Sequence, residues 1–456
     1  MDWVALVDVY RYANRMAVGT TIFALSSGPG KAGVAVIRVS GPAVRELMHT
    51  MASPEIGDRR AAFRRIVHPT TNALLDRAVV VFFAGPNSET GEDVVEFQVH
   101  GGRAVVRAVL DALATVPDCR MADPGEFARR AFDHGKLNLV EVESLADLVD
   151  AETDAQRHFA LQSGSQLSTL YEGWRTRLIE IAALTEAAID FSDEGDVSAS
   201  SFEAARERAQ PLADDLARHL NDGHRGEILR DGFRVVLVGA PNAGKSSLLN
   251  ALARRDAAIV SEEAGTTRDV IEVGLDLEGY PVIVTDTAGI RETEGAIERE
   301  GIRRTLAAAR AADLNVWLSE TGLDSPPSEI SRETLLAVRT KIDLESAAGA
   351  GSDLAISAKT GAGLAELTGE IARRAKRAMT SSDDPAAMPA VAQARHRGLV
   401  ESASQSLQDF LIGSADDLEL RAEDVRRAAH ALGRITGRVD VEDVLGTIFS
   451  RFCIGK

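Results

Sequence analysis

A glycine-rich segment near the middle of the chain has the residue types and spacing that bind a nucleoside triphosphate. Gly239-Ala-Pro-Asn-Ala-Gly244-Lys245-Ser246 matches the pattern GxxxxGK[ST] and follows the strand predicted over Phe233–Val238. In such a turn, successive backbone N–H groups point inward around phosphate oxygens. Lys245 would place a positive charge beside the β- and γ-phosphates, and the Ser246 hydroxyl would bind Mg²⁺. The residues expected to line the phosphates are Asn242, Ala243, Gly244, Lys245, Ser246 and Ser247.

Two further segments could complete the magnesium site. Asp286-Thr287-Ala288-Gly289 follows the strand predicted over Val282–Thr285. The Asp286 carboxylate can hold the Mg²⁺ hydration shell, and the Gly289 N–H can contact the γ-phosphate. Gly265-Thr266-Thr267-Arg268-Asp269 lies between this segment and the glycine-rich turn. A threonine hydroxyl there can bind Mg²⁺ when triphosphate is bound, with Thr267 as the preferred candidate and Thr266 as the alternative.

Two later segments could recognise the purine base. Thr340-Lys341-Ile342-Asp343 ends the strand predicted over Leu335–Thr340. The Asp343 carboxylate can accept hydrogen bonds from N1–H and the 2-amino group of guanine, whereas adenine would leave it unpaired at a cost of about 1–3 kcal/mol. Lys341 can lie along the ring, and Ser357-Ala358-Lys359 can offer a backbone N–H to the guanine oxygen. Four such segments in this order predict a guanine-nucleotide site.

Thr340 departs from the common pattern, which has asparagine at this position. That asparagine mainly ties the base-binding loop to the glycine-rich turn. The sequence therefore predicts weaker nucleotide affinity without loss of base specificity.

Hydrolysis of GTP needs a group that orients the attacking water and a second positive charge. Many switch GTPases use a glutamine directly after the Asp-x-x-Gly segment, but here that residue is Ile290, which cannot bond to water. The acidic candidates just downstream are Glu292, Glu294, Glu298 and Glu300. The positive charge could come from Arg268, from Arg291, or from a monovalent cation held by the Asn242 amide and carbonyls of the loop 261–266.

The elements around these segments predict a multidomain α/β protein. An extension, 1–19, precedes an α+β domain over 20–137, in which strand-like and helix-like patterns alternate. Its expected strands are Thr21–Leu25, Gly33–Val39, Ala78–Phe83 and Val94–Val99, and its expected helices are Pro42–Met51, Arg103–Leu113 and one that begins near Glu126. Helical spacing over 138–229 and 379–456 predicts a helical bundle in two parts. Between them, 230–378 has the order of a doubly wound sheet and is predicted to be an inserted Ras-like P-loop GTPase domain.

The bulk composition fits a globular protein in a reducing compartment. A net charge of −18 argues against indiscriminate nucleic-acid binding, because neutralising phosphates requires clustered Lys and Arg. Two cysteines are too few for a disulfide framework. No apolar run is long enough to span a membrane, and the first residues carry Asp2 and Asp8 in place of the basic start of a signal peptide. These features predict a soluble, cytoplasmic protein.

The two ends of the chain carry segments that resemble one family. Phe452-Cys453-Ile454-Gly455-Lys456 is similar to the C-terminal Cys-[Ile/Val/Leu]-Gly-Lys signature of the MnmE (TrmE) family of tRNA-modification GTPases. Further segments that look like family blocks are Gly33–Gly41, Pro86–Asp93, His100–Gly102, Gly125–Leu137, Gly433–Gly437 and Asp443–Phe449. The resemblance covers nearly everything after about Thr20.

The resemblance implies a homodimer held by the N-terminal domains, each of which binds a 5-formyl- or 5,10-methylene-tetrahydrofolate derivative as the one-carbon donor. It implies a heterotetramer with an FAD-containing partner of the MnmG (GidA) family. Together the two proteins would place an aminomethyl-type or carboxymethylaminomethyl group on C5 of the wobble uridine, U34, of certain tRNAs. GTP hydrolysis would be activated by K⁺-dependent dimerisation of the GTPase domains.

The functional residues of the family fall on positions of this sequence with suitable chemistry. The folate contacts fall on Arg38, Glu96, Lys136 and Lys456, of which the basic residues can pair with glutamyl carboxylates. The potassium ligands fall on Asn242, Ser261, Glu263 and Thr266, and Ser261 also belongs to the nucleotide site. The two residues expected to act in catalysis are Glu298, which would position the water, and Cys453, the tail thiol.

Two other functions compete with the modification of tRNA. The first is a ribosome-assembly switch that docks on rRNA. Such proteins often carry a basic RNA-binding module after the GTPase domain, whereas the flanks here are helical, acidic on balance and end in Cys-Ile-Gly-Lys. The second is a scaffold whose GTP cycle only remodels its partners.

Overall fold

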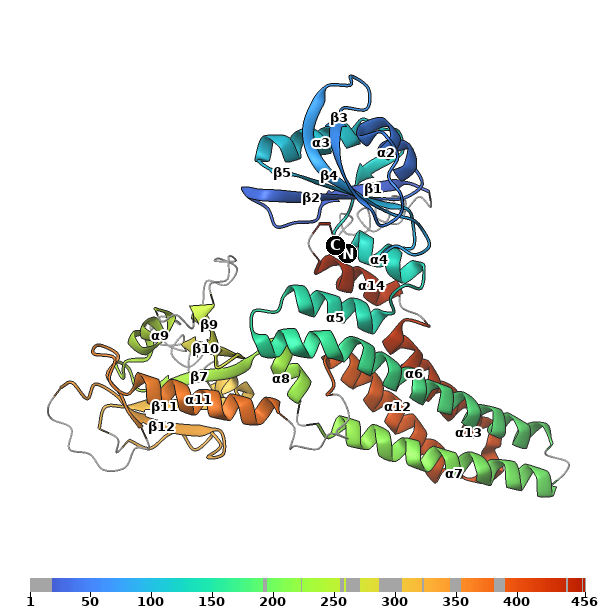
Figure 1. The fold of residues 1–456 in the computed structure, drawn as a ribbon. Helices are drawn as coiled ribbons and strands as arrows, with labels where there is room; N and C mark the ends of the chain where they lie inside the picture. The colour runs from blue at the N-terminus through green and yellow to red at the C-terminus, as the bar shows by residue number, and fades with distance from the viewer. Residues whose placement is uncertain are drawn as a thin grey trace, which may run out of the picture. The chain divides into compact units, whose positions relative to one another are not determined.

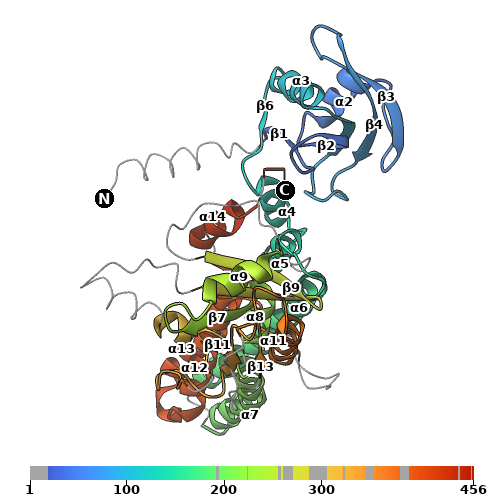
Figure 2. The same ribbon diagram turned by 90° about the vertical axis from the view of Figure 1, so that its left-hand side faces the viewer.

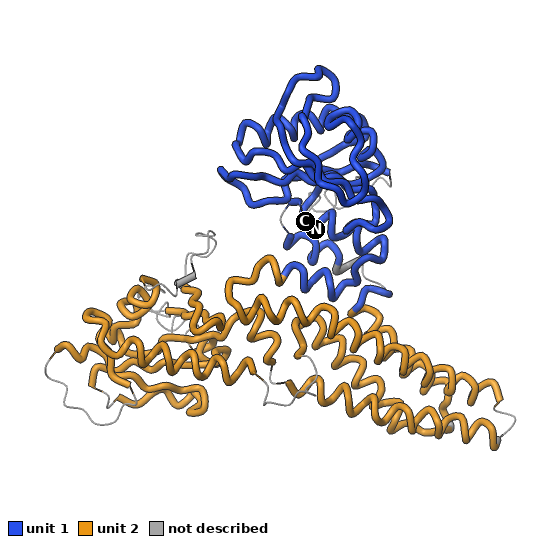
Figure 3. Tube along the Cα trace, in the orientation of Figure 1, with its two compact units in different colours: residues 1–146, 436–456 blue, residues 147–435 orange. Residues whose placement is uncertain are grey.

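A computed structural model describes residues 19–191, 195–222, 224–254, 258–259, 271–286, 306–321, 324–344, 354–380, 390–439, 442–452 and 454–455. The chain divides into two compact units: unit 1 comprises residues 1–146 and 436–456, and unit 2 comprises residues 147–435 (Figure 3). Residues 436–456, which the sequence analysis assigned to the helical part, thus pack within unit 1.

Unit 1 is built on a six-stranded sheet with the order β3-β4-β5-β2-β1-β6 (Figures 1 and 2). Neighbouring strands are antiparallel, except for the parallel pair β1 and β6. Two helices, α2 (Val44–Ala52) and α3 (Arg103–Ala114), cover one face, where alternate strand residues such as Ile37 and Phe97 are fully buried. The strands are β1 (Thr21–Leu25), β2 (Ala32–Ser40), β3 (Ala61–Val67), β4 (Leu74–Phe83), β5 (Val94–Gly101) and β6 (Cys119–Met121).

Three more helices of unit 1 bring the end of the chain beside its N-terminal part. They are α4 (Glu126–Asp133), α5 (Leu139–Val149) and α14 (Glu442–Ser450). Phe449 and Phe452 are buried against residues of α4 and α5. The approach is so close at Gly125 that a Cβ there would lie 2.5 Å from the Phe449 carbonyl oxygen. Only glycine fits this position, which also has a φ of +68°.

The helical part of unit 2 consists of α6 (Asp154–Asp190), α7 (Gly195–Leu220), α12 (Ala394–Ile412) and α13 (Leu418–Thr436) (Figure 1). Thr153 and Gln156 form a capping box, which fixes the start of the long helix α6. Inside the bundle, the Tyr171 ring makes edge-on contacts with the rings of His219 and His396. Burial lowers the pKa of His219 to about 4, so this histidine is neutral at physiological pH.

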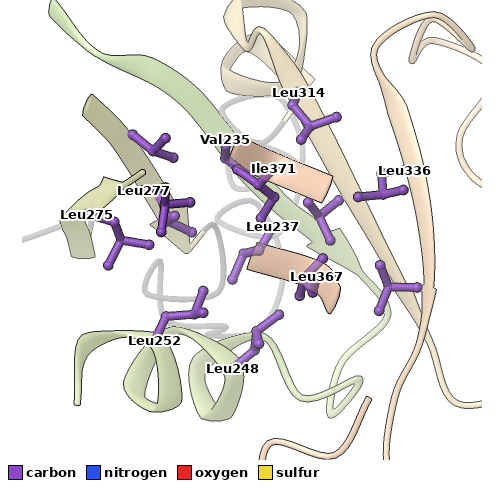
Figure 4. Packing of buried hydrophobic residues seen from close by; sticks show 14 of the residues in the cluster. Val235, Leu237, Leu248, Leu252, Leu275, Leu277, Leu314, Leu336, Leu367 and Ile371 are labelled. Atoms are coloured by element: carbon purple, nitrogen blue, oxygen red, sulfur yellow. The ribbon is translucent and has the colours of Figure 1, made fainter. Parts of the chain in front are cut away.

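The α/β part of unit 2 is a seven-stranded sheet with the order β13-β12-β11-β7-β10-β9-β8. The five strands β13, β12, β11, β7 and β10 pair in parallel, whereas β9 is antiparallel to β10 and β8 is antiparallel to β9. Val235 and Leu237 of β7 pack in one cluster with Leu248 of α9 and Ile371 of α11 (Figure 4). The elements are β7 (Phe233–Gly239), α9 (Lys245–Ala253), β8 (Ala258–Ile259), β9 (Ile271–Leu277), β10 (Tyr280–Asp286), β11 (Leu314–Ser319), β12 (Leu335–Arg339), β13 (Leu354–Ala355) and α11 (Leu364–Met379). This arrangement confirms the predicted fold class.

The chain enters and leaves the α/β part through two segments that are tied together. Asp222 precedes α8 (Arg225–Asp231), and its carboxylate accepts a hydrogen bond of 2.9 Å from the backbone N–H of Val391. The same carboxylate accepts 2.7 Å from the guanidinium of Arg397, which also donates to Glu227 at 3.1 Å. The α/β part is therefore an insertion whose two ends meet. No helix in the described part of the chain is long and apolar enough to cross a membrane.

Candidate functional site

The phosphate-binding turn joins β7 to α9, as the sequence predicted. Gly244 has a φ of +97° and Asn242 a φ of +66°. These left-handed residues turn the backbone just before the N-terminus of α9, where N–H groups can bind phosphate. A Cβ at Gly239 would lie 2.5 Å from the Leu318 carbonyl oxygen, so glycine is required where β7 passes β11. Lys245 is buried, and its ammonium donates to the carbonyls of Gly239 at 2.8 Å and Ala240 at 3.0 Å. The lysine charge is thus held at the turn.

The two described residues expected at the magnesium site lie in direct contact. The Ser246 hydroxyl donates a hydrogen bond of 2.6 Å to Oδ2 of Asp286, which is fully buried at the end of β10. Parallel pairing of β10 with β7 brings the two segments to the same edge of the sheet. A hydroxyl and a carboxylate are oxygen donors of the kind that Mg²⁺ prefers, so these residues fit the ion.

Thr340 makes the connection that the sequence analysis attributed to asparagine. Its hydroxyl donates a buried hydrogen bond of 2.8 Å to the carbonyl of Ala243 in the phosphate-binding turn. Its backbone N–H donates 2.9 Å to the carbonyl of Ser319, which fixes the start of the base-binding loop. Weaker nucleotide affinity was expected because this connection would be missing, and the structure shows that Thr340 makes it. The affinity itself stays a prediction.

We expect Thr340→Val to lower the affinity for GDP about tenfold, because valine keeps the shape but leaves the buried Ala243 carbonyl without its donor. Thr340→Ser keeps the hydroxyl and should bind GDP nearly as well as the wild type. Isothermal titration of both variants with GDP measures the difference. Equal affinities for the valine variant and the wild type would show that the Thr340 connection does not support the site.

The base-recognising carboxylate is oriented before any base is present. The Ser357 hydroxyl donates 2.7 Å to Oδ1 of Asp343, and the Thr360 N–H donates 3.1 Å to that hydroxyl. The bond from Ser357, together with the charges of Lys359 and Lys341, lowers the pKa of Asp343 and keeps it ionised. Asp343 can therefore accept two hydrogen bonds from guanine at neutral pH.

Lys341 has a neighbour that the sequence analysis missed. Its ammonium forms an ion pair with Glu320, directly after β11. The φ of Lys341 is +59°, a conformation that few residues other than glycine, asparagine or aspartate adopt. No local pattern in the sequence marks Glu320, because the pair forms only when β11 and β12 lie side by side.

The remaining predicted residues of the nucleotide site make none of the contacts above or are not described. Asn242, Ser247 and Lys359 are exposed, and Ala358 is half-buried beside the base loop. The predicted residues Ser261, Glu263, Thr266, Thr267, Thr287, Ala288, Gly289, Glu298, Cys453 and Lys456 lie outside the described residues. The predicted roles in potassium binding, water positioning and thiol chemistry therefore stay predictions.

In unit 1 the structure brings together two of the four residues expected to bind folate. Arg38 on β2 lies directly opposite Glu96 on β5, and its Nε donates 3.1 Å to Oε1 of Glu96. A second guanidinium nitrogen lies 2.7 Å from a carboxylate oxygen of Glu89, which is half-exposed. The ring of Phe127 lies 5.8 Å from the Arg38 guanidinium carbon. Lys136 is exposed, and among the described contacts none joins it to this pair.

A buried ionic network next to this pair was also missed from the sequence. Glu126 is 2% exposed and accepts two hydrogen bonds from Arg120, at 2.6 and 2.8 Å, and one from Arg130 at 3.1 Å. Arg130 also donates 2.9 Å to Glu92, which accepts 2.7 Å from Ser40. Burial alone would raise the pKa of Glu126, but Arg120 and Arg130 hold it below its ordinary value. The network joins α4 to β2 and β6.

The sheet order, the lysine-bearing turn, the Ser246–Asp286 contact and the oriented Asp343 define a P-loop protein that binds guanine nucleotides, which is a GTPase. Two family models match the chain: "GTP-binding protein TrmE N-terminus" over residues 21–136 and "MnmE helical domain" over residues 139–453. The chain therefore belongs to the MnmE family of tRNA modification GTPases.

Similar proteins match along almost the entire chain. The tRNA modification GTPase MnmE of Parvibaculum lavamentivorans is 50% identical over 442 residues, which cover 96% of this chain and 100% of that protein. The protein of the same name from Methylobacterium radiotolerans is 48% identical, with 96% of this chain and 99% of that protein covered. The family resemblance predicted from the terminal segments is thus confirmed.

Proposed function

We propose that this chain is the K⁺-activated GTPase of a complex that modifies the wobble uridine, U34, of certain tRNAs. The observation that carries the proposal is an intact guanine-nucleotide site in a chain that matches tRNA modification GTPases along nearly its whole length. The chain acts as a homodimer in the cytoplasm and forms a heterotetramer with an FAD-containing partner. A tetrahydrofolate one-carbon unit contributes to the aminomethyl-type or carboxymethylaminomethyl group placed on C5 of the base.

The described residues would bind and orient GTP in this reaction. The Lys245 ammonium exchanges its bonds to two backbone carbonyls for the β- and γ-phosphates. Ser246 and Asp286, which now share a hydrogen bond, would hold Mg²⁺ together with Thr267. Mg²⁺ when bound offsets the negative charge of the phosphates. Glu298 is proposed to orient the attacking water, which removes the difficulty posed by Ile290.

The same proposal assigns a carboxylate-binding role to Arg38. Its guanidinium lies between Glu96, which is mostly buried, and Glu89, which is half-exposed. A glutamyl carboxylate of the folate would replace Glu89, because the exposed partner is the easier one to displace. Glu96 stays to hold the guanidinium, and Lys136 and Lys456 add positive charge. Cys453 is proposed to act near the one-carbon unit.

Nucleoside analysis of tRNA from cells that lack this chain tests the proposal. We expect the C5-modified wobble uridines to disappear and to return when the wild-type chain is supplied. Wobble uridines that persist unchanged would exclude the modification role and would favour a ribosome-assembly switch or a scaffold.

Replacing K⁺ by Na⁺ at constant ionic strength should slow GTP turnover by at least about tenfold. The reason is that the proposed site at Asn242 and the 261–266 loop selects an ion of K⁺ size, and that ion supplies the positive charge beside the transferred phosphate. Steady-state release of phosphate in the two salts measures the effect. Equal turnover would exclude Asn242 and this loop from the mechanism. Arg268 and Arg291 would then be the remaining candidates for the second positive charge.

A further inference from the structure

The C-terminal tail, residues 453–456, contacts the end of β1 through Gly455. The Ser26 hydroxyl donates a hydrogen bond of 2.9 Å to the carbonyl of Gly455, 429 residues further along the chain. Gly455 is buried, although Ile454 beside it is half-exposed. Gly455 therefore packs against the segment that follows β1.

Gly455 is the residue that makes this contact possible. Its φ is +105°, a conformation that side chains strongly disfavour. A Cβ at this position would lie 2.2 Å from the Leu25 carbonyl oxygen and 3.0 Å from the Cα of Ser26. The obstacle is backbone at both points, so neither neighbour can turn aside as a flexible side chain would.

The other partner of the contact is equally fixed. The backbone N–H of Ser26 donates 2.8 Å to the Val36 carbonyl, and the Val36 N–H donates 3.2 Å to the Ser27 hydroxyl. These bonds extend the pairing of β1 with β2, in which Ala24 lies opposite Arg38. Ser26, directly after β1, is thus two residues from Ala24, whose neighbours across the sheet are Arg38 and then Glu96.

We infer that Ser26 and Gly455 form a clamp that holds the C-terminal tail beside the Arg38–Glu96 pair, so that Ser26 is a positioning residue for the tRNA modification reaction. This inference rests on the proposed function for its catalytic meaning, but the clamp itself can be tested without that function. Phe452, buried in the cluster with Phe449, fixes the start of the tail, and the clamp fixes its end. The segment between these two points carries the predicted thiol, Cys453.

Digestion of the full-length protein with carboxypeptidase B, followed by mass spectrometry, measures whether the tail is held. This enzyme removes a terminal lysine only from an accessible chain end. Because residue 455 adjoins the cleaved bond, each rate is divided by that of a free peptide with the same C-terminal residues. On this scale we expect the wild type to lose Lys456 slowly, and Gly455→Ala to lose it at least about tenfold faster, because the added methyl group cannot be accommodated. Ser26→Ala removes one hydrogen bond and should give a rise of about threefold to tenfold, whereas Ser26→Thr keeps the hydroxyl and restores slow digestion.

Gly446→Ala is the matched control, because a Cβ at Gly446 in α14 would meet nothing within 4 Å. It should digest as slowly as the wild type. GTP turnover in K⁺ should be the same for Gly455→Ala, Gly446→Ala and the wild type, which shows that the nucleotide site is intact. In cells, Gly455→Ala should lose the wobble-uridine modification while Gly446→Ala keeps it.

Equally slow digestion of Gly455→Ala and the wild type would overturn the clamp. Faster digestion with unchanged wobble-uridine modification would overturn the positioning role and leave the proposed function standing. If the modification persists even in cells that lack the chain, the proposed function and the positioning role fall together, and the digestion result still decides whether the clamp exists.

Discussion

Asp343→Asn should exchange guanine for xanthine as the preferred base. The carboxylate accepts hydrogen bonds from guanine N1–H and the 2-amino group, and its orientation is set by the 2.7 Å bond from Ser357. An asparagine amide can still accept from N1–H, but its NH₂ group then faces the 2-amino group of guanine, donor against donor. Xanthine carries an oxygen at this position, which pairs with the amide NH₂.

We expect the affinity of Asp343→Asn for GDP to fall at least about a hundredfold, since two hydrogen bonds to a charged acceptor are affected. The affinity for XDP should exceed that for GDP in the variant, and the order should be reversed in the wild type. Isothermal titration with GDP, XDP and ADP provides the comparison. A variant that still prefers GDP over XDP would mean that Asp343 does not contact the base.

Glu126→Ala should cause a large loss of stability in unit 1. The substitution leaves Arg120 and Arg130 with positive charge at a site where Glu126 itself is 2% exposed. Removing one partner from a buried ion pair costs about 3–5 kcal/mol. Here Arg120 would keep only Asp123, 3.9 Å away, as an acidic partner, and Arg130 would keep only Glu92. Urea unfolding followed by circular dichroism measures the change in the free energy of unfolding.

The control in the same unit is Asp111→Ala. Asp111 pairs with Arg107 at 3.6 Å, and both side chains are more than two-thirds exposed. An exposed pair of this kind contributes less than about 1 kcal/mol, so Asp111→Ala should unfold almost like the wild type. Similar losses for the two variants would mean that the Glu126 network is no more stabilising than a surface ion pair.

The same network predicts how the stability of unit 1 depends on pH. The folded-state pKa of Glu126 is lowered relative to the unfolded chain, so its contribution is complete above the unfolded value of about 4.3. It is lost as the pH falls through the lower, folded-state value, because protonation then removes the charge that balances Arg120 and Arg130. Glu126→Ala should therefore show a weaker loss of stability with acid than the wild type.

The sequence predicted the elements whose residues repeat with a clear period. Most predicted strands and helices of unit 1 occur within a few residues of their expected bounds, but β3 was missed. In β3, Arg64 and Arg65 follow Phe63, which is 65% exposed, so apolar and polar residue types do not alternate along its sequence. It forms because its backbone pairs with β4 at the edge of the sheet. The short β6 was missed for the related reason that three residues carry no periodic signal.

The candidate site was predictable where one segment carries the chemistry and unpredictable where distant segments meet. The contact of Ser246 with Asp286 follows from placing two motifs at the ends of neighbouring strands. The bond from Thr340 to the Ala243 carbonyl joins residues 97 positions apart. It forms because the fold brings the threonine hydroxyl within hydrogen-bonding distance, which the sequence does not indicate. Glu126 and Arg120 look like ordinary charges of a helix start and a loop until the fold buries them together.

The tie between Asp222 and Val391 has a consequence for how this protein could be dissected. The chain enters the α/β part after Asp222 and leaves it before Val391, and these two residues are hydrogen-bonded to each other. The segment between them can therefore be removed and the two ends joined without distorting the rest of the fold. A short glycine-serine bridge from Asp222 to Val391 would leave α7 and α12 in their places. The remainder, which keeps unit 1 and the four helices α6, α7, α12 and α13, could then be studied apart from the excised GTPase module, or the module could be transplanted into a surface loop of an unrelated host.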